Sequence, residues 1–404
     1  METQAQVGNI IRKYAEEIKD ELIEWRRYLH MHPELSGEEY NTAKFVAQKL
    51  EEFGVDEIIP NFGGTTAVVG LIKGNGDKTV ALRADMDALP MDELVENRPY
   101  KSQVKGVMHS CGHDAHTAIL LGAAKVLAKI KDKLKGNIKL IFQPCEERHD
   151  CKGAKALVEA GVLENPKVNV IFGLHMFPEL PAGVVGTRIG ELMASSDVFH
   201  IKIKGRGSHA SRPHMGVDPV IIAAQAINSL HHIVSRKVDP LHPAVLTVGK
   251  ISGGHAENVI PDEVDMSGTV RTLSIDLRDQ IPKWMEHTLW GITTAYGGAY
   301  EFEYQEGTPP VINDTETTKF ALKKLREFLG EDKVVELEYP SMGGEDFSEY
   351  LMKVPGTFFR LGIRNEEKGI KYPLHSPLFD IDEDVLPLGV EVLSILSEEW
   401  LREN

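Results

Sequence analysis

Apolar residues recur along the chain at two spacings, one typical of helices and one typical of buried strands. Residues 6–30 and 38–54 place apolar side chains three or four positions apart, which is the helical period. Residues 67–72 and 79–84 are short and apolar, which is typical of strands covered on both faces. The alternation continues with helices at 116–131, 153–160, 316–329 and 385–401 and strands at 138–142, 168–174 and 357–361. The pattern predicts an α/β fold with helices on both faces of a sheet.

The middle of the chain follows a different order of elements. Its periodicity predicts strands at 199–203, 245–251, 264–272 and 300–304 and helices at 218–234 and 281–295. The order β-α-β-β-α-β is the split βαβ pattern of a small, ferredoxin-like two-layer domain. We therefore expect three segments: residues 1–188 and 299–404 form a large α/β domain, and residues 189–298 form a domain inserted into it.

Composition narrows the classes of partner. Asp and Glu outnumber Lys and Arg by 61 to 45, which gives a formal net charge of −16. A field of that sign repels phosphate backbones and anionic lipid headgroups, so we expect neither nucleic-acid nor membrane partners. No apolar run approaches the roughly 20 residues of a membrane-spanning helix, and the N-terminus carries acidic residues where a signal peptide has an apolar core. We expect a soluble, cytoplasmic protein.

The strongest chemical signal is the segment HSCGHDAH at 109–116, which holds three imidazoles, a thiol and a carboxylate within eight residues. Cys111 and His113 are two positions apart, so one turn can direct both at a single ion. Thiolate and imidazole ligands suit zinc and its neighbours rather than magnesium or calcium. The alternative interpretation makes Cys111 a small core residue and uses the histidines as caps of the helix that follows.

A pair of carboxylates follows the apolar strand at 138–142, in the segment QPCEE at 143–147. Two adjacent carboxylates at a strand end cannot both point the same way. One can bind a metal while the other faces the substrate as a general base, which is the division that metallohydrolases need. An acidic pair alone is more often solvated surface, but ligand crevices open at strand ends in α/β sheets.

Other candidate ligands stand alone. His175 ends the strand at 168–174, and His375 lies in a loop bounded by prolines. Asp85 and Asp87 follow the strand at 79–84, where a carboxylate commonly accepts a proton from a metal-bound histidine and orients its ring. Taken singly, each of these residues is as well explained by a structural role.

Together these segments resemble the M20 metallopeptidases, in the branch that contains aminoacylases, hippurate hydrolases, auxin-conjugate hydrolases and thermophilic carboxypeptidases. The resemblance covers essentially the whole chain. It rests on RADMDALP at 83–90, HSCGHDAH at 109–116, QPCEE at 143–147, GLH at 173–175, GRGSHASRPH at 205–214, GGHAENVIPDEV at 253–264, GTVRT at 268–272, GGEDFSEY at 343–350 and LHSP at 374–377.

The resemblance implies a role for each candidate. It makes Glu146 the general base, and Asp87 the carboxylate that orients a ligand. Asp85 stands where other M20 branches carry a metal-binding histidine. The implied cofactor is Zn²⁺, with Co²⁺ or Mn²⁺ as alternatives, at one or two ions per subunit. The implied metal ligands are Cys111, His113, Glu147, His175 and His375.

The resemblance also makes residues 189–298 a lid and dimerisation domain. His209 matches a histidine that reaches over the active site, often from the neighbouring subunit, and donates to the oxyanion of the reaction. Asn258 and Arg271 match positions that bind the free carboxylate of the substrate, a task suited to a guanidinium fork. We therefore expect a homodimer or a dimer-based oligomer.

The implied function is metal-dependent hydrolysis of the amide bond of N-acyl or N-peptidyl amino acids, of the aminoacylase or carboxypeptidase type, through a metal-activated water. The substrate is then a small acyl-amino acid or a short peptide. One alternative is a specialised biosynthetic deacylase, such as one acting on N-acyl-diaminopimelate. Another is a non-hydrolytic protein that binds metal or conjugates, which would have no reason to keep Glu146 together with His209.

One segment departs from the family pattern. After the glutamate pair the family is typically rich in glycine, whereas here residues 145–151 read CEERHDC. Cys145 and Cys151 could pair, bind a metal or stay reduced, and the expected intracellular location favours reduced thiols.

Overall fold

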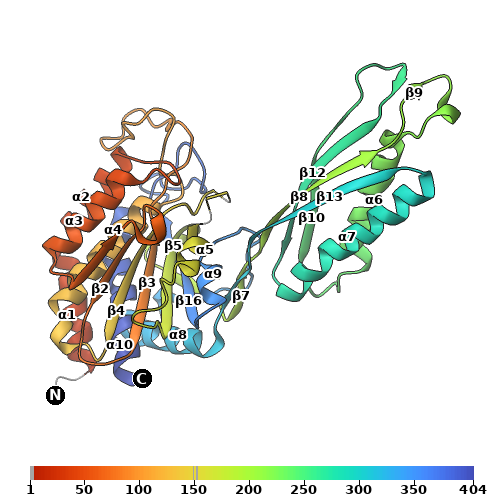
Figure 1. Ribbon diagram of the computed structural model, residues 1–404. Helices are drawn as coiled ribbons and strands as arrows, with labels where there is room; N and C mark the ends of the chain where they lie inside the picture. Colours follow the sequence, from red (N-terminus) through yellow and green to blue (C-terminus); the bar gives the residue numbers. More distant parts are fainter. Residues whose placement is uncertain (1–3, 149, 152) are drawn as a thin grey trace. The chain divides into compact units, whose positions relative to one another are not determined.

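A computed structural model describes residues 4–148, 150–151 and 153–404 (Figure 1). The chain separates into two compact units. Unit 1 comprises residues 1–190, 313–338 and 349–404, and unit 2 comprises residues 191–312 and 339–348. The predicted boundary at 298 falls directly before a strand that pairs with the sheet of unit 2, so the structure keeps that strand in unit 2. Residues 339–348 join unit 2 without any signal in the hydrophobic pattern.

Unit 1 is built on an eight-stranded mixed sheet in the order β1-β2-β4-β3-β5-β16-β6-β15. Strands β3, β4 and β5 run parallel to one another, as does β16 to β5, so their carboxyl ends share one edge. Every residue of β2 and β3 is buried, which explains why both are mainly apolar; the polar residues of β3 are Thr79, Arg83 and Asp85. The strands are β1 Glu57–Pro60, β2 Val68–Ile72, β3 Thr79–Asp85, β4 Asn137–Gln143, β5 Val170–Pro181, β6 Val185–Thr187, β15 Val334–Glu336 and β16 Gly356–Arg364.

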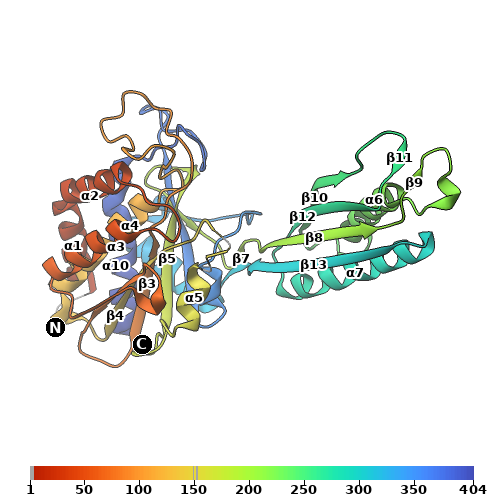
Figure 2. The same cartoon turned by 45° about the horizontal axis from the view of Figure 1, so that its top comes forward.

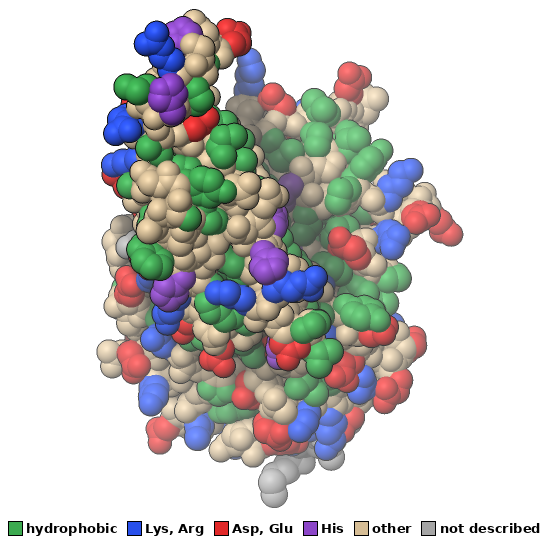
Figure 3. All heavy atoms as spheres, turned by 90° about the vertical axis from the view of Figure 1, so that its right-hand side faces the viewer, with side chains coloured by type: hydrophobic (Ala, Val, Ile, Leu, Met, Phe, Trp, Pro, Cys, Tyr) green, Lys and Arg blue, Asp and Glu red, His purple; other side chains and the backbone are tan. Residues whose placement is uncertain are grey.

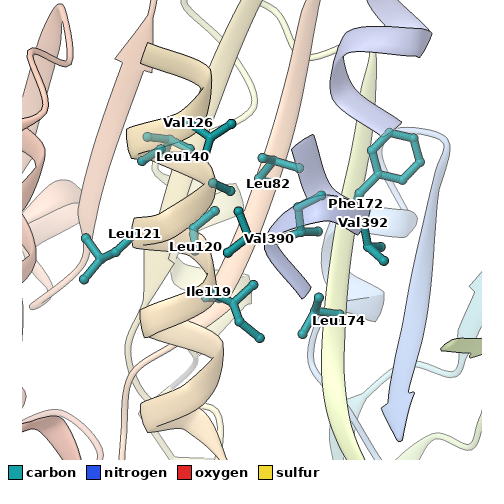
Figure 4. Close-up of a cluster of buried hydrophobic side chains, with 14 of the residues drawn as sticks. Leu82, Ile119, Leu120, Leu121, Val126, Leu140, Phe172, Leu174, Val390 and Val392 are labelled. Atoms are coloured by element: carbon teal, nitrogen blue, oxygen red, sulfur yellow. The ribbon is translucent and has the colours of Figure 1, made fainter. Parts of the chain in front are cut away.

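The helices of unit 1 pack around a central pair, α4 and α10. A Cβ atom at Gly122 of α4 would lie 2.6 Å from Val390, and one at Gly389 of α10 would lie 2.4 Å from Ile119. The absence of side chains at these two glycines therefore lets the helices cross closely, and Ile119, Leu120 and Val390 fill the space beside the crossing (Figure 4). The helices are α1 Gln4–Glu17, α2 Lys19–Met31, α3 Tyr40–Glu52, α4 His113–Lys129, α5 Gly153–Glu159, α8 Thr315–Leu329, α9 Ser348–Leu351 and α10 Leu386–Glu403.

Unit 2 contains a four-stranded antiparallel sheet in the order β10-β12-β8-β13, with its own apolar core beneath α6 and α7 (Figure 2). Asp218 begins α6 by accepting hydrogen bonds from Val220 and Ile221, and Ser274 caps α7 in the same way. The element order along the chain is the predicted one. The elements are β8 Ser196–Lys204, β9 Ser208–His209, α6 Pro219–Arg236, β10 Ala244–Gly253, β11 Val259–Ile260, β12 Glu263–Thr272, α7 Ile275–Tyr296 and β13 Ala299–Thr308.

The predicted mixed α/β architecture is confirmed, and the long helices and buried strands lie where the periodicity indicates. Two short strands, β7 Gly190–Met193 and β14 Val311–Asn313, pair with each other and carry no periodic signal. Among the residues that the structure describes, no helix has both the length and the apolar character needed to cross a membrane.

Candidate metal centre

Segments distant in sequence converge at one edge of the sheet in unit 1. Strand β3 ends at Asp85, β4 ends at Gln143, three residues before Glu146, and His175 lies in β5. Because these three strands are parallel, the residues at their carboxyl ends meet where ligand crevices form in such sheets. The first residue of α4 is His113, which brings the helix start to the same place.

The five predicted metal ligands come together here. Cys111 Sγ lies 3.4 Å from His175 Nε2, and Glu147 Oε1 lies 3.3 Å from His375 Nε2. His113 Nε2 lies 3.9 Å from Glu147 Oε1. Cys111, His113 and His175 form one group of donors within 4.8 Å of one another, and Cys111, Glu147 and His375 form a second. The two groups share the Cys111 sulfur.

Asp87 orients the His113 ring. The Nδ1 of His113 lies 2.9 Å from the Asp87 carbonyl oxygen and 3.1 Å from its carboxylate, so Nε2 faces the other donors. The carboxylate also accepts hydrogen bonds from the Glu147 N–H and from the Ser36 hydroxyl. Burial raises the pKa of Asp87, but the hydrogen bond from His113 outweighs it and holds the pKa below its ordinary value. Ser36 was not predicted, because only the fold brings it to Asp87.

The two remaining histidines of HSCGHDAH have other surroundings. His116 Nδ1 lies 2.5 Å from Asp85 Oδ1, and His116 Nε2 accepts the Met176 N–H at 2.8 Å. Both ring nitrogens of His116 therefore make hydrogen bonds within the protein. His116 thus fixes strand β5 through the Met176 N–H and keeps no nitrogen free to bind a metal. His109 is buried and neither ring nitrogen has a hydrogen-bond partner among the described residues; burial lowers its pKa to about 4.

Asp85 lies beneath the cluster. Its carboxylate accepts a hydrogen bond from Arg83 at 2.7 Å as well as the one from His116. One oxygen lies 3.7 Å from His113 Nε2, so Asp85 borders the donor set. Arg83 and His116 are both almost fully buried, and their hydrogen bonds fix the Asp85 carboxylate beside α4.

A tight turn carries the glutamate pair. Cys145 adopts φ +65°, a left-handed conformation that costs a residue other than glycine roughly 1–2 kcal/mol. It forms a disulfide with Cys151, their Cα atoms being 5.9 Å apart. The expectation of reduced thiols is therefore wrong for these two cysteines, because the turn brings their Cα atoms to bridging distance. Cys111 stays free and buried. Glu146 Oε2 lies 4.0 Å from His113 Nε2.

The loop that carries His375 is tied to the Cys111 segment. The His375 N–H donates to the Ser110 carbonyl oxygen at 2.8 Å, and His375 itself has φ +60°. Its side chain is 54% exposed, which makes it the most accessible of the predicted ligands. The neighbouring Glu147 carboxylate raises the pKa of His375.

The donor set fits a transition metal. His113 Nε2 is fully buried and makes no hydrogen bond with any described residue, although Asp87 holds the ring with this nitrogen toward the cluster. Burial and the nearby Glu147 carboxylate raise the pKa of the Cys111 thiol well above its ordinary value. Sulfur, imidazole and carboxylate donors together match zinc and similar ions.

The other predicted residues belong to unit 2. His209 pairs with Val259 between β9 and β11, and the Ala210 N–H donates to the Asn258 carbonyl oxygen, so His209 and Asn258 share one end of the unit. His209 is exposed, and its Nδ1 accepts the Ser211 N–H. Arg271 is at the far end of β12, where its Nη1 donates to the Met342 carbonyl oxygen at 3.2 Å.

The chain is similar to known proteins over most of its length. A family model described as peptidase family M20/M25/M40 matches residues 81–399. Thermostable carboxypeptidase 1 of Saccharolobus solfataricus is 45% identical over 386 residues, which are 95% of this chain and 96% of that protein. An N-acyl-L-amino acid amidohydrolase of Geobacillus stearothermophilus is 45% identical over 304 residues, 75% of this chain and 80% of that protein. A crystal structure from Bacillus subtilis, described as a dinuclear metal-binding peptidase of the M20 family, is 37% identical, with a TM-score of 0.84 over 96% of this chain and 99% of that one.

Proposed function

The chain belongs to peptidase family M20/M25/M40 and is a metal-dependent amide hydrolase, and on that premise we propose that it cleaves N-acyl or N-peptidyl amino acids that carry a free carboxylate. The observation that carries the proposal is the buried Nε2 of His113, which makes no hydrogen bond with the residues that the structure describes and lies beside the Glu146–Glu147 pair. A single site there holds metal donors and a second carboxylate for proton transfer.

The proposed ligands are Cys111, His113, Glu147, His175 and His375. The two donor groups that share Cys111 support two metal positions. The thiolate makes the site softer than an all-oxygen one, which favours Zn²⁺, with Co²⁺ and Mn²⁺ as alternatives. A cation bound there polarises the substrate carbonyl and makes a water easier to deprotonate.

The remaining chemistry belongs to the chain's own residues. Glu146 takes a proton from the attacking water as its oxygen bonds to the carbonyl carbon, and then delivers that proton to the amine nitrogen as the C–N bond breaks. Asp87 keeps the His113 ring in the orientation that ligation needs. His209 donates a hydrogen bond to the carbonyl oxygen as negative charge develops on it.

We propose that unit 2 is a ferredoxin-like lid and dimerisation domain. Asn258 precedes β12 and Arg271 lies near its other end. The strand from Glu263 to Arg271 spans roughly 25 Å at about 3.3 Å per residue. One substrate carboxylate therefore cannot contact Asn258 and Arg271 of the same chain. A site that uses both needs Arg271 from one chain and Asn258, with its neighbour His209, from a second copy.

The surface of unit 2 supports such pairing. Strand β10 is at the edge of its sheet, with β12 as its neighbour on one side. Apolar side chains stand exposed on it and on α6, notably Ile221 at 53% and Ile251 at 52%. Figure 3 shows one face of the molecule, on which hydrophobic and histidine side chains are exposed among the charged ones. Two-fold dimers are the commonest assemblies of this kind.

A mixed-dimer experiment tests base and lid together. Glu146→Gln should lose at least about 10²–10⁴-fold in kcat with its metal retained, and His209→Ala should also be impaired. Mixed under subunit exchange, the two variants should regain activity, because one site then combines an intact Glu146 with the partner's intact histidine. Near-normal turnover by metal-replete Glu146→Gln would refute the base. Absence of recovery despite demonstrated exchange would refute the shared site.

A further inference from the structure

Residues 36–39 form a brace beneath the turn that carries the glutamate pair. The Glu39 side chain is completely buried. Its Oε1 accepts the Gly37 N–H at 2.8 Å and the Cys145 N–H at 3.0 Å, and its Oε2 accepts the Thr66 hydroxyl. Both oxygens are therefore used, and one of them anchors the residue directly before Glu146.

The same brace anchors the other side of the pair. Ser36 donates to the Asp87 carboxylate at 2.6 Å, and that carboxylate accepts the Glu147 N–H at 3.0 Å. The Arg148 guanidinium also reaches back to the Ser36 carbonyl oxygen. Glu146 is thus flanked by two backbone N–H groups, each fixed by a buried carboxylate.

The hydrogen bond from the Cys145 N–H to Glu39 fixes the backbone at a residue whose conformation is locally unfavourable. A left-handed residue other than glycine persists only when its surroundings hold it, and Cys145 has φ +65°. The disulfide to Cys151 holds its side chain, whereas Glu39 holds its N–H. Rotation of the Pro144–Cys145 peptide would break the hydrogen bond from the Cys145 N–H to Glu39 and redirect the chain that carries both carboxylates of the pair.

We propose that Glu39 is a positioning residue for amide hydrolysis, which sets the direction of Glu146 and Glu147 through the Cys145 N–H. The proposal rests on the roles proposed above for Glu146 and Glu147. It concerns a part of the chain outside residues 81–399, to which the family model is matched. Glu39 acts through the backbone and does not touch the reacting atoms.

A hydrogen-bond acceptor, not a charge, is what this position requires. Burial raises the pKa of Glu39 to about 6, although the Thr66 hydroxyl opposes the shift, so the charged form has a cost there. Glutamine keeps the same length and an oxygen that accepts both N–H groups, and its amide can donate to Thr66. Aspartate keeps the charge but is one methylene shorter, so it cannot hold Gly37, Thr66 and Cys145 at once.

The test compares Glu39→Gln, Glu39→Asp and Glu39→Ala with wild type and with Glu38→Gln, a matched control at the adjacent, exposed position. Each protein is assayed for kcat and KM on an N-acyl amino acid with saturating zinc. Zinc affinity of the metal-free protein is measured by chelator competition, and folding by thermal unfolding. Glu146→Gln is assayed in parallel.

We expect Glu39→Gln and Glu38→Gln to match wild type within about threefold. Glu39→Asp and Glu39→Ala should lose about 10–100-fold in kcat with KM nearly unchanged, and should bind zinc about 10–100-fold more weakly. If Glu39→Ala does not fold, the comparison of kcat and zinc affinity between Glu39→Gln and Glu39→Asp still tests the proposal. Wild-type kcat and zinc affinity in Glu39→Asp, or a loss in Glu39→Gln larger than in Glu39→Asp, would overturn the proposal. An inactive Glu146→Gln beside normal Glu39 variants would overturn this inference alone, whereas an active Glu146→Gln would overturn the proposed function.

Discussion

Replacement of Arg26 by methionine should destabilise unit 1 far more than a change at the neighbouring Arg27. The Arg26 guanidinium is completely buried and donates to Asp114 at 2.8 Å, to Asp380 at 3.0 Å and to Glu383 at 3.2 Å. Asp114 directly follows the proposed ligand His113, and Asp380 lies shortly after the His375 loop. One cation therefore joins α2 to two of the segments that carry metal donors.

The expected loss in free energy of unfolding follows from the buried carboxylate that the substitution leaves without its cationic partner. Asp114 is itself completely buried, and loss of one partner of a buried pair typically costs about 3–5 kcal/mol. His30 stays 2.7 Å from the same carboxylate, so Asp114 keeps one hydrogen-bonding partner and we expect the lower end, about 3 kcal/mol. Arg27 is 41% exposed, so Arg27→Met should cost no more than about 1 kcal/mol.

The loss should also depend on pH. Burial raises the pKa of Asp114, but Arg26 and His30 outweigh it and hold the pKa well below its ordinary value. A carboxyl with a lowered pKa stabilises the fold above its ordinary pKa, and that contribution disappears as pH falls through the folded value. Without Arg26 the pKa of Asp114 rises, so protonation relieves the penalty and the cost should be smaller at pH 5 than at pH 7.5.

Urea unfolding of the metal-free proteins, followed by circular dichroism and tryptophan fluorescence at both pH values, measures these differences. The double variant Arg26→Met/Asp114→Asn should recover part of the loss, because no uncompensated charge remains. A cost for Arg26→Met below 1 kcal/mol, or equal to that of Arg27→Met, would show that the buried network does not support unit 1 as argued.

Two further predictions concern the metal and the last helix. Chelation should inactivate the enzyme reversibly, and Cys111→Ala should bind less zinc per chain by elemental analysis; full activity after chelation, or unchanged zinc in the variant, would contradict the ligand set. Burial and the neighbouring Glu399 raise the pKa of Glu398 to about 7, so its stabilising contribution is present at low pH and is lost as pH rises toward 7. Glu398→Gln should therefore match wild type in Tm at pH 5 and exceed it at pH 8, and a Tm difference independent of pH would refute this.

Much of the site was predictable because its residues flank regular elements. The parallel strands β3, β4 and β5 are buried and strongly apolar, so the periodicity locates them, and their carboxyl ends meet by the rules of α/β sheets. Asp87 lies two residues after the end of β3, and Glu147 lies four residues after the end of β4. To predict that Cys111 and His113 lie near these strand ends, one needs in addition only the start of the helix that follows them, which its apolar residues mark clearly.

The choice among the three histidines of HSCGHDAH was not predictable from that segment. His116 is occupied by Asp85 and by the Met176 N–H, which come from two different strands. The order of these strands in the sheet decides which nitrogens remain available. The spacing of the histidines along the chain does not reveal which of their nitrogens are already hydrogen-bonded within the protein.

The disulfide and the domain limits depended on local geometry and on long-range pairing. A left-handed φ at Cys145 has no sequence signature, since glycine is the residue that normally marks it. Strand β13 was predicted as a strand, but its place in unit 2 depends on pairing with β8. Glu39 was missed for a similar reason, because its partners Thr66 and Cys145 are far from it in sequence.

The close crossing of α4 with α10 has a consequence for biosynthesis. A ribosome adds about 5–20 residues per second, so α4 leaves it roughly tens of seconds before α10 is made. During that interval Gly122 lacks Val390 and Ile119 lacks Gly389, the neighbours that α10 supplies in the native protein. Residues 191–312, which carry a separate core, are complete by then and can fold first. The nascent chain therefore presents an apolar helix face beside a finished neighbour, and it is this intermediate that chaperones would meet.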